Sequence, residues 1–402
     1  MSFAQLQVNQ KQWRLAGQRL IEMAIAEFLY EEIIQVTDLK NNRYQLTLDD
    51  QTYTFKAQNY LLGHWQIEEG SVRELSVAED LPAWNLHTFI RAFSNQTEVK
   101  PFTKAYLIKE MNNTWLAEAH LFDESRLSSA AALTASHHEI EGMLRGHPWL
   151  IMSKGRMGFG YDDYLSAAPE LSPTVKVLWL AVHRDLAEFR STEEWQAGRL
   201  YQHELSVEEL ANFEQKLHER GCSCRDFFLI PVHAWQWHQW LVPTYANEIV
   251  DQRIIELGVG QDDYVPMQSI RTLCNISQPE RHYVKLPVSI FNTAVYRGLP
   301  SKRNLAAPAV TAWLKQIQSQ DSDLKQSGVA FLGEVATLTI HQPCFDQIEG
   351  APYQFKELFG CLWRESVDPM IGTGEQALSQ AALLHRDING QSILAVLILA
   401  SG

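Results

Sequence analysis

The stretch from Arg145 to Gly160 gathers residue types that bind small polyanions. It holds one histidine, three cationic side chains and four glycines but no acidic residue, in a chain with 34 Lys+Arg against 48 Asp+Glu. Glycine lets backbone N–H groups approach a ligand closely, and Lys and Arg supply fixed positive charge. The pattern predicts a pocket for a nucleotide phosphate or a polycarboxylate, with a solvated turn as the alternative. The GxxxxGK[ST] signature is absent, so this is not a P-loop.

The segment from Pro231 to His238 reads PVHAWQWH and follows an apolar run of strand length. A polar, aromatic-rich turn at a strand end is a common place for ligand contacts. His233 and His238 stand five apart, but no helical H-E-x-x-H zinc motif is present. Aromatic packing around a hydrogen-bonded core histidine is the alternative interpretation.

A serine and an arginine alternate in the segment from Met267 to Thr272. If this segment is extended, Ser269 and Arg271 lie on the same face. A hydroxyl beside a guanidinium forms an anion clamp, because Arg offers a two-donor fork and Ser a short donor. A surface strand without a ligand is the alternative.

Further cations follow in the next apolar run and just beyond it. Lys285 lies among apolar residues, where burial of a lysine is costly without a partner. Thr293 and Arg297 are four apart and share one face if the chain is helical there. A strand edge with solvated cations is the alternative. Together with Arg271, Arg303 and the cations at 145, 154 and 156, these side chains are predicted to line one groove.

The first elements that must position these residues are predicted to be mostly helices. Apolar residues recur at helical spacing from 13 to 34, and 83–145 is expected to be largely helical. A hairpin is predicted at 44–57, where polarity alternates on both sides of a short turn. We therefore predict that 1–125 is a mainly helical domain.

The rest of the chain predicts a mixture of helices and strands. Residues 126–330 contain a helix over 207–220 with Ser206 as its N-cap, and a Pro287 that marks a strand edge or bulge. Residues 331–402 alternate short strands and helices and end in an apolar segment, 392–400, that suits a buried strand or helix. Three apolar runs have strand length, the first of which equally suits a buried helix: 175–183, 227–233 and 283–291.

Composition narrows the class of protein. A length of 402 residues predicts two or three domains. The net charge of −14 argues against nucleic acid as a partner, because phosphate backbones repel such a surface. No apolar signal region and no run of eighteen apolar residues is present, so no membrane partner is expected. Five cysteines without zinc-site spacing predict reduced thiols in a cytoplasmic protein.

Taken in order, these motifs resemble those of the IucA/IucC-type synthetases, the NRPS-independent siderophore synthetases. The resemblance covers roughly residues 85 to 400, and the segment 161–170 is similar to the family's continuation of its first motif. Four segments carry it: Gly146-His147-Pro148 with Lys154-Gly-Arg156-Met-Gly158-Phe159, Pro231-Val-His-Ala-Trp-Gln236, Ser269-Ile-Arg-Thr272, and Lys285 with Thr293 and Arg297 at the family spacing.

The resemblance implies an α+β, hand-like fold with a thumb (1–125), fingers (126–330) and the start of a palm (331–402). It implies a ligase of siderophore biosynthesis that uses ATP and Mg²⁺ to adenylate a carboxylate, citrate or a citrate derivative, for attack by an amine or hydroxyl. A homodimer is expected, and no protein side chain is expected to ligate a metal. The implied ATP contacts are His147, Lys154, Arg156, Ser269, Arg271, Lys285 and Thr293. The implied substrate contacts are Arg297 and Arg303, with Arg297 and Thr293 as catalytic candidates.

The charge logic of adenylation fits these residues. A carboxylate must meet an α-phosphate, so two anions come together, and fixed cations with Mg²⁺ offset the repulsion. The family's second His-Pro is replaced by Leu150-Ile151, and Ala234 stands for a proline. The family's palm carries an H-Q-N-like segment, and nothing like it occurs before Gly402, since 385–389 does not match. The sequence therefore predicts an incomplete site and little or no ligase activity for these 402 residues.

Two other classes of function stay open. One is a non-catalytic module that binds a nucleotide or citrate, or that acts as a scaffold. The other is a metal-dependent hydrolase that uses His137, His138, His233 and His238. The hydrolase is the weaker of the two, because adjacent histidines at 137 and 138 are expected to point to different sides of a helix or strand.

Overall fold

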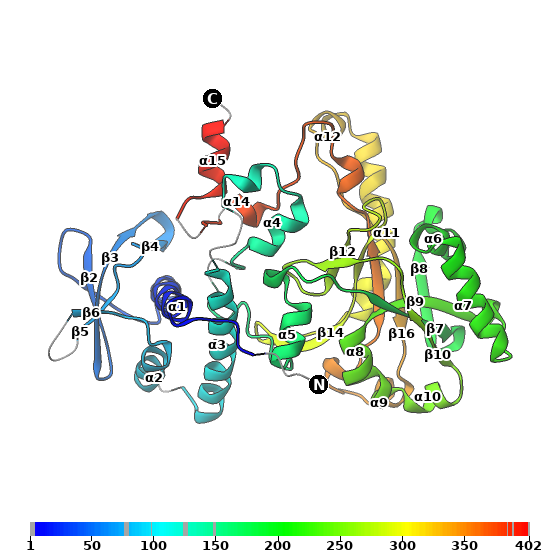
Figure 1. Ribbon diagram of the computed structural model, residues 1–402, viewed down its shortest axis with the longest axis horizontal. Coiled ribbons are helices and arrows are strands. Elements are labelled where there is room, and N and C mark those ends of the chain that lie inside the picture. The colour runs from blue at the N-terminus through cyan, green and yellow to red at the C-terminus, as the bar shows by residue number, and fades with distance from the viewer. Residues whose placement is uncertain are drawn as a thin grey trace.

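Three helices and a small antiparallel sheet form the N-terminal part of the computed structural model, at the left of Figure 1. The structure describes residues 5–75, 80–97, 99–123, 128–147, 150–383, 385–387 and 390–400, without the side chains of 80–82. The helices are α1 (Gln10–Tyr30), α2 (Leu86–Gln96) and α3 (Pro101–Leu121). The six strands are β1 (Thr37–Asp38), β2 (Arg43–Leu48), β3 (Gln51–Asn59), β4 (Trp65–Ile67), β5 (Arg73–Leu75) and β6 (Asp80–Pro82).

Helix α1 packs so closely on its neighbours that one position must be glycine. A Cβ at Gly17 would lie 2.1 Å from the carbonyl oxygen of Trp84 and 2.8 Å from the Trp115 ring. The indole N–H of Trp115 also donates to the carbonyl of Trp13 across 2.8 Å. Helix α1 is thereby fixed against α3, which lies in the middle of the molecule in Figure 1.

The sequence predictions for this region are partly confirmed. The helix at 13–34 corresponds to α1, and the hairpin at 44–57 corresponds to β2 and β3. Strands β4, β5 and β6 were not predicted, because each is only three residues long and too short to show a period. The predicted domain boundary at residue 125 falls on 124–127, outside the described residues, and stays a prediction.

Further antiparallel sheets occupy the other half of the molecule (Figure 1). One has the strand order β10-β7-β9, another β11-β12-β13-β17-β16-β8, and β14 and β15 form a two-stranded ribbon. The strands are β7 (Val177–His183), β8 (Ala187–Ser191), β9 (Phe227–His233), β10 (Ile254–Val259), β11 (Tyr264–Pro266), β12 (Thr272–Asn275), β13 (Tyr283–Lys285), β14 (Val288–Asn292), β15 (Val295–Arg297), β16 (Glu334–Ile340) and β17 (Gly360–Arg364).

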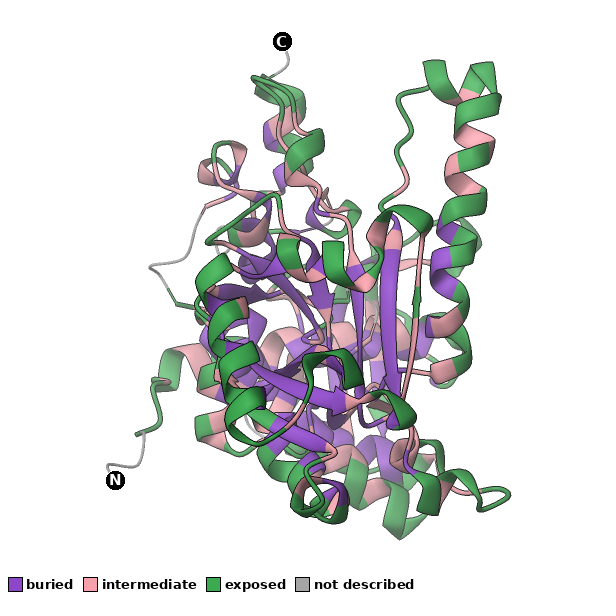
Figure 2. Ribbon diagram, turned by 90° about the vertical axis from the view of Figure 1, so that its right-hand side faces the viewer, coloured by how far each residue is buried: buried purple, intermediate pink, exposed green. Residues whose placement is uncertain are grey.

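Helices surround these sheets, and Figure 2 shows buried strands inside with exposed residues on the outward helix faces. The α-helices described after residue 128 are α4 (His137–Met143), α5 (Tyr161–Ala167), α6 (Ala197–Glu204), α7 (Val207–Glu219), α8 (Ala234–Gln236), α9 (Val242–Thr244), α10 (Ala246–Val250), α11 (Ser301–Gln320), α12 (Ser322–Gln326), α13 (Pro343–Asp346), α14 (Gln380–Leu383) and α15 (Ile393–Ala400). None of the helices in the described part of the chain combines the length and apolar character that a membrane crossing requires.

Local sequence signals were reliable where a single element decides the outcome. Ser206 caps α7, accepting from the Glu209 N–H while the Glu209 carboxylate accepts from the Ser206 N–H. The run at 175–183 contains a strand, β7, and not a helix. The apolar segment at 392–400 contains helix α15, but the expectation of burial is largely wrong, since Ile393 and Val396 are buried while Leu399 is 78% exposed.

Candidate functional site

The first sequence motif and β14 are joined by backbone and amide contacts. The side-chain oxygen of Asn292 accepts from the Arg156 N–H at 3.0 Å, and its amide nitrogen donates to the Ser153 carbonyl at 3.1 Å. Met157 and Phe291 exchange two backbone hydrogen bonds of 2.8 Å. The first motif and β14, which are more than a hundred residues apart in the sequence, are therefore hydrogen-bonded directly to each other.

Gln236, the last residue of the His-Ala-Trp-Gln motif, fixes the other side of β14. Its fully buried amide accepts from the Ser289 N–H at 2.8 Å and donates to the Ser289 hydroxyl and the Leu358 carbonyl, both at 2.9 Å. Trp235 packs edge-on against Phe159 with ring centroids 4.9 Å apart. The motif thus has a structural role in holding β14.

His233 is a core histidine, as the alternative interpretation held. Burial lowers the pKa of His233 to about 4, so the ring is neutral at pH 7. Its Nδ1 accepts from the Trp235 N–H at 3.2 Å, and this contact caps the start of helix α8. His238 is exposed on the following helical turn and does not join His233.

The Ser-Ile-Arg-Thr motif is a tight turn, and the expectation of an extended segment is wrong. It connects β11 to β12, with Ile270 at φ +60°. The Ser269 hydroxyl accepts from the Thr272 N–H at 3.1 Å and donates to the Thr272 hydroxyl at 2.8 Å. The Arg271 carbonyl accepts from the Leu286 N–H at 2.8 Å. The Arg271 guanidinium donates to the Gly298 carbonyl. The turn is therefore fixed against the residue that follows β13 and the residue that follows β15.

Thr293 and Arg297 belong to a hairpin, so the helical expectation for them is also wrong. Thr293 and Ala294 form the turn at φ +52° and +62°, and Arg297 pairs with Val288 at the base of the ribbon. Pro287 separates β13 from β14, which agrees with the predicted edge or bulge. Arg297 therefore lies near Arg271, while Thr293 lies at the far end of the hairpin.

Several cations gather where the turn, β13 and β15 meet. Burial and the neighbouring charge of Arg297 lower the pKa of Arg271 to about 10, against an opposing effect of Glu357. Burial also lowers the pKa of Lys285, and the charges of Arg364 and Arg271 lower it further. Like charges held this close repel one another, and an anion bound among them removes that repulsion. The Arg271 Nε is buried without a hydrogen-bond partner, which is uncommon for a buried donor.

A cavity of about 340 Å³ opens beside this cluster, between α11 and β16. Arg303 of α11 and Arg364 of β17 line it, and Thr311 ties α11 to β16 through the Glu334 backbone at 2.9 and 3.0 Å. Arg364 also pairs with the Glu334 carboxylate at 2.6 Å. The volume lies within the range of small-molecule sites. We call Arg271, Lys285, Arg297, Arg303 and Arg364 the cation cluster.

Lys154 and Arg156 are paired with carboxylates away from the cation cluster. The Lys154 ammonium lies 2.5 Å from Glu118 on α3 and also donates to the Arg145 carbonyl. The Arg156 guanidinium binds Glu170 through both of its terminal nitrogens, one at 2.7 Å. All four side chains are buried. Although burial alone raises the pKa of Glu170, the Arg156 charge holds it at about 2, so both groups are ionised.

His147 lies in a different place again. It is exposed and lines a separate cavity of about 180 Å³ beside α1, together with Glu27, His64 and Trp65. Pro148, the next residue of the motif, lies outside the described residues. The structure thus brings together Ser269, Arg271, Lys285, Arg297 and Arg303, but does not place His147, Lys154, Arg156 or Thr293 beside them.

Arg364, Glu334 and Glu357 complete the surroundings of the cluster, and sequence reasoning missed them. Burial raises the pKa of Glu357, while the nearby charges of Arg271 and Arg303 lower it. Arg364 follows an apolar strand in the sequence, as Lys285 does. A cation at the end of an apolar strand was therefore the sequence signal that could have identified Arg364. Its closeness to Lys285 depends on the pairing of β13 with β17, which is not visible in the sequence.

His137 and His138 do not diverge as expected. Their ring centroids are 5.6 Å apart, and both offer nitrogen atoms near the buried Cys274 thiol. The His137 Nε2 lies 2.9 Å from the Tyr283 hydroxyl, so this side of the ring is hydrogen-bonded. A second group of possible ligands is formed by His203, Glu204 and His282.

Comparison with known proteins gives matches over nearly the whole chain. Residues 136–385 match the model of the IucA / IucC family. The rhizobactin siderophore biosynthesis protein RhbF of Rhizobium meliloti (strain 1021) is 38% identical over 98% of this chain and 66% of its own length. The putrebactin synthase of Shewanella sp. (strain MR-4) is 34% identical over 97% of this chain and 62% of its own length. The chain thus spans about two thirds of the length of these relatives.

A solved structure confirms the fold. The aerobactin synthetase IucC from a hypervirulent pathotype of Klebsiella pneumoniae aligns with 98% of this chain and 69% of its own, at 27% identity and a TM-score of 0.86. The α+β, multi-domain synthetase fold expected from the sequence is therefore present.

Proposed function

Because this chain belongs to the IucA / IucC family, we propose that it carries the ATP-binding and carboxylate-binding part of a ligase that makes a siderophore. In the proposed reaction, a carboxylate of citrate or of a citrate derivative is adenylated and then attacked by an amine or hydroxyl. The carrying observation is the cation cluster, in which burial lowers the pKa of Arg271 and of Lys285 and neighbouring cluster cations lower both further.

The arrangement of the cluster suggests how the two ligands divide. Arg271 and Lys285 lie on neighbouring strand ends, since Thr272 pairs with Lys285, and we assign them to the phosphates. Arg303 lines the cavity along α11, and we assign it to the carboxylate together with Arg297. Ser269 and Thr293 offer hydroxyls from two turns, of which Ser269 is the nearer to Arg271.

Mg-ATP, when bound, supplies the adenylyl group that activates the carboxylate. The buried and unpaired Arg271 Nε fits such a polyphosphate. Arg297 and Arg303 hold the carboxylate against its repulsion from the phosphates, and the surrounding walls restrict water. We assign no protein ligand to Mg²⁺. We keep His147 as a phosphate contact on the family resemblance alone. For Lys154 and Arg156 we propose a structural role in stabilising their loop, in place of contact with the ligand.

Titration with Mg-ATP separates this proposal from a fold without a ligand. We expect the 402-residue chain to bind Mg-ATP by calorimetry, and the Arg271→Ala and Lys285→Met variants to bind at least tenfold more weakly, since each loses a charge-assisted contact. Arg190→Ala, which changes an exposed arginine on β8, is the matched control. Equal binding by all variants would contradict the placement of ATP in the cation cluster.

A non-catalytic module that binds a nucleotide or citrate is the second candidate. Release of pyrophosphate on addition of citrate and an amine supports the ligase for this chain, and binding without turnover supports the module. The homodimer, the cytoplasmic location and the low activity of these 402 residues remain predictions from the sequence.

A further inference from the structure

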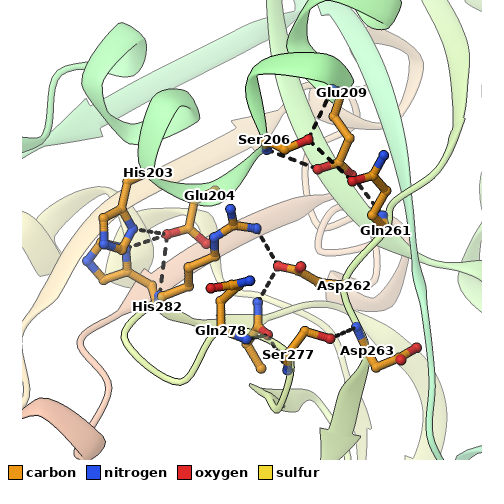
Figure 3. A network of polar contacts seen from close by, with 12 residues as sticks. His203, Glu204, Ser206, Glu209, Gln261, Asp262, Asp263, Ser277, Gln278 and His282 are labelled. Carbon is orange, nitrogen blue, oxygen red and sulfur yellow. Dashed lines mark hydrogen bonds and ion pairs between the residues drawn. The ribbon is translucent and has the colours of Figure 1, made fainter.

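Three side chains of the kind that ligate metals meet outside the cation cluster. His203 and Glu204 end α6, and His282 immediately precedes β13 (Figure 3). The Nδ1 atoms of His203 and His282 lie 2.8 and 2.7 Å from the same Glu204 oxygen, Oε1. Ligand atoms of all three residues lie within 4.8 Å of one another.

The two oxygens of the Glu204 carboxylate differ in their hydrogen bonding. Its Oε1 accepts from both imidazoles and also from the His282 backbone N–H at 3.3 Å. Its Oε2 is buried without a hydrogen-bond partner. Buried polar atoms in native proteins nearly always have a hydrogen-bond partner. A carboxylate with one oxygen that accepts three hydrogen bonds and another that accepts none therefore needs an explanation.

Within the described residues, the Glu204 carboxylate forms no ion pair with a lysine or an arginine. Glu204 pairs with the two histidines only, while the nearby Arg281 is held by Asp262 at 2.5 Å. A carboxylate that is almost fully buried is costly to keep ionised without a counter-charge. A bound cation would supply that charge.

The surroundings suit an ion that enters from one side. Glu204 and His282 are buried, but 28% of the His203 side chain is exposed. Trp195 packs edge-on against both imidazoles, with centroid distances of 4.9 and 4.5 Å. The ring shields one side of the group and leaves the His203 side open for a water ligand.

We propose that His203, Glu204 and His282 bind one divalent transition-metal ion of the Zn²⁺ type. Two imidazole nitrogens and one carboxylate oxygen, with a fourth position open to water, form a ligand set that zinc favours over Mg²⁺ or Ca²⁺. Tetrahedral zinc with bonds of about 2.0–2.2 Å separates its ligand atoms by about 3.3 Å, so the present 2.7–2.8 Å contacts must open only slightly.

Proton positions agree with this exchange. A carboxylate oxygen only accepts, so both imidazoles now carry hydrogen on Nδ1. On binding the ion, each ring offers the Nδ1 lone pair and keeps one hydrogen on Nε2, and any second hydrogen is released to water. No oxidant, reductant or leaving group is needed.

The other histidine group is the poorer candidate. His137 already engages Tyr283 through Nε2, and its Nδ1 lies 3.7 Å from Asp368. Burial raises the pKa of the Cys274 thiol to about 12, which disfavours the thiolate that a metal requires. This group therefore serves as the internal control.

The position of the ion would restrain a strand of the cation cluster. Lys285 lies three residues after His282, on β13. This consequence, unlike the metal site itself, rests on the proposed function. Zinc binding is therefore tested first, without ATP, so that failure of the ATP proposal leaves this one intact.

The experiment is zinc binding by the whole chain after removal of metal with a chelator. Equilibrium dialysis with elemental analysis is expected to give one Zn²⁺ per chain with a dissociation constant below about 10 µM, and Zn²⁺ is expected to raise the thermal midpoint because it binds only the folded chain. His203→Ala and Glu204→Gln are expected to weaken binding at least tenfold. The matched control, H137A/H138A, keeps the wild-type affinity.

Folding of each variant is checked by circular dichroism without zinc. Glu204→Gln keeps the shape and an acceptor oxygen, so it remains informative if a larger change unfolds α6. Wild-type protein that binds no zinc below about 10 µM would overturn the proposal. So would binding that survives in His203→Ala and is lost in H137A/H138A.

Discussion

Replacing Glu170 by glutamine tests the reassignment of the first motif. The side chains of Arg156 and Glu170 are 4% and 0% exposed, so the guanidinium loses its paired carboxylate within an ion pair that water does not reach. The amide of Glu170→Gln keeps one acceptor oxygen but cannot neutralise the positive charge. We therefore expect a large loss of stability, and no gain of nucleotide binding from a released Arg156.

Two routes give a similar magnitude. Removing one partner of a buried ion pair typically costs about 3–5 kcal/mol. Independently, the Glu170 pKa falls from 4.5 to about 2, which at about 1.4 kcal/mol for each pKa unit corresponds to about 3 kcal/mol. Because the folded pKa lies below the unfolded value, this contribution is complete above pH 4.5 and is lost as the pH falls towards 2.

Urea unfolding followed by tryptophan fluorescence measures the effect. At pH 7, Glu170→Gln should lower the free energy of unfolding by about 3 kcal/mol or more, and the difference from wild type should shrink between pH 4.5 and 3. The control is Glu188→Gln, which breaks an exposed pair with Arg190 and should cost less than about 1 kcal/mol. The reasoning is refuted if the two variants lose the same stability at pH 7.

A double replacement separates the structural role from ligand contact. Arg156→Leu combined with Glu170→Leu removes both charges, and such exchanges are often neutral or stabilising. We expect the double variant to be more stable than Glu170→Gln and to bind Mg-ATP as wild type does. Loss of binding in a folded double variant would return Arg156 to the list of phosphate contacts.

Three smaller changes give further tests. Burial raises the Glu22 pKa to about 7, so the free energy of unfolding falls as the pH rises from 4.5 to 7. The Glu22→Gln variant still accepts from the Gly70 N–H. Measured by urea unfolding, it should be more stable than wild type at pH 8 and equal to it at pH 4. Gln236→Leu should cost about 1–3 kcal/mol and weaken Mg-ATP binding, because the Ser289 N–H is left buried without an acceptor; a calorimetric titration showing unchanged binding would separate β14 from the site. Ala294→Gly should raise the thermal midpoint, since it relieves a positive φ that costs roughly 1–2 kcal/mol, and a lower midpoint would contradict the turn geometry.

Local patterns predicted elements whose cause is local. The capping box of Ser206 and Glu209 is four residues long, and it placed the start of α7 correctly. The hairpin of β2 and β3 was likewise readable from alternation around one turn. The spacing of Thr293 and Arg297 left a helical face and a strand edge open, because a spacing of four also fits a hairpin that closes on two residues with positive φ.

The roles of the cations could not be read in the same way. Lys154 and Arg156 look like Arg271 and Lys285 in the sequence, yet the first two are neutralised by Glu118 and Glu170. Their partners are 36 and 14 residues away, and the local sequence gives no sign of the pairing. Whether a cation is held by the protein or left for a ligand therefore depends on tertiary contacts.

The Gln236 amide also has a consequence for the order of folding. It joins α8 to β14 and to the carbonyl of Leu358, which is 122 residues away along the chain. Contacts between such distant segments form late, because closing a long loop costs entropy before the contact repays it. The support of β14 can then be complete only after most of the chain has been synthesised and has collapsed. Partly folded chains would lack a formed cation cluster, and they would not compete with the native protein for nucleotide.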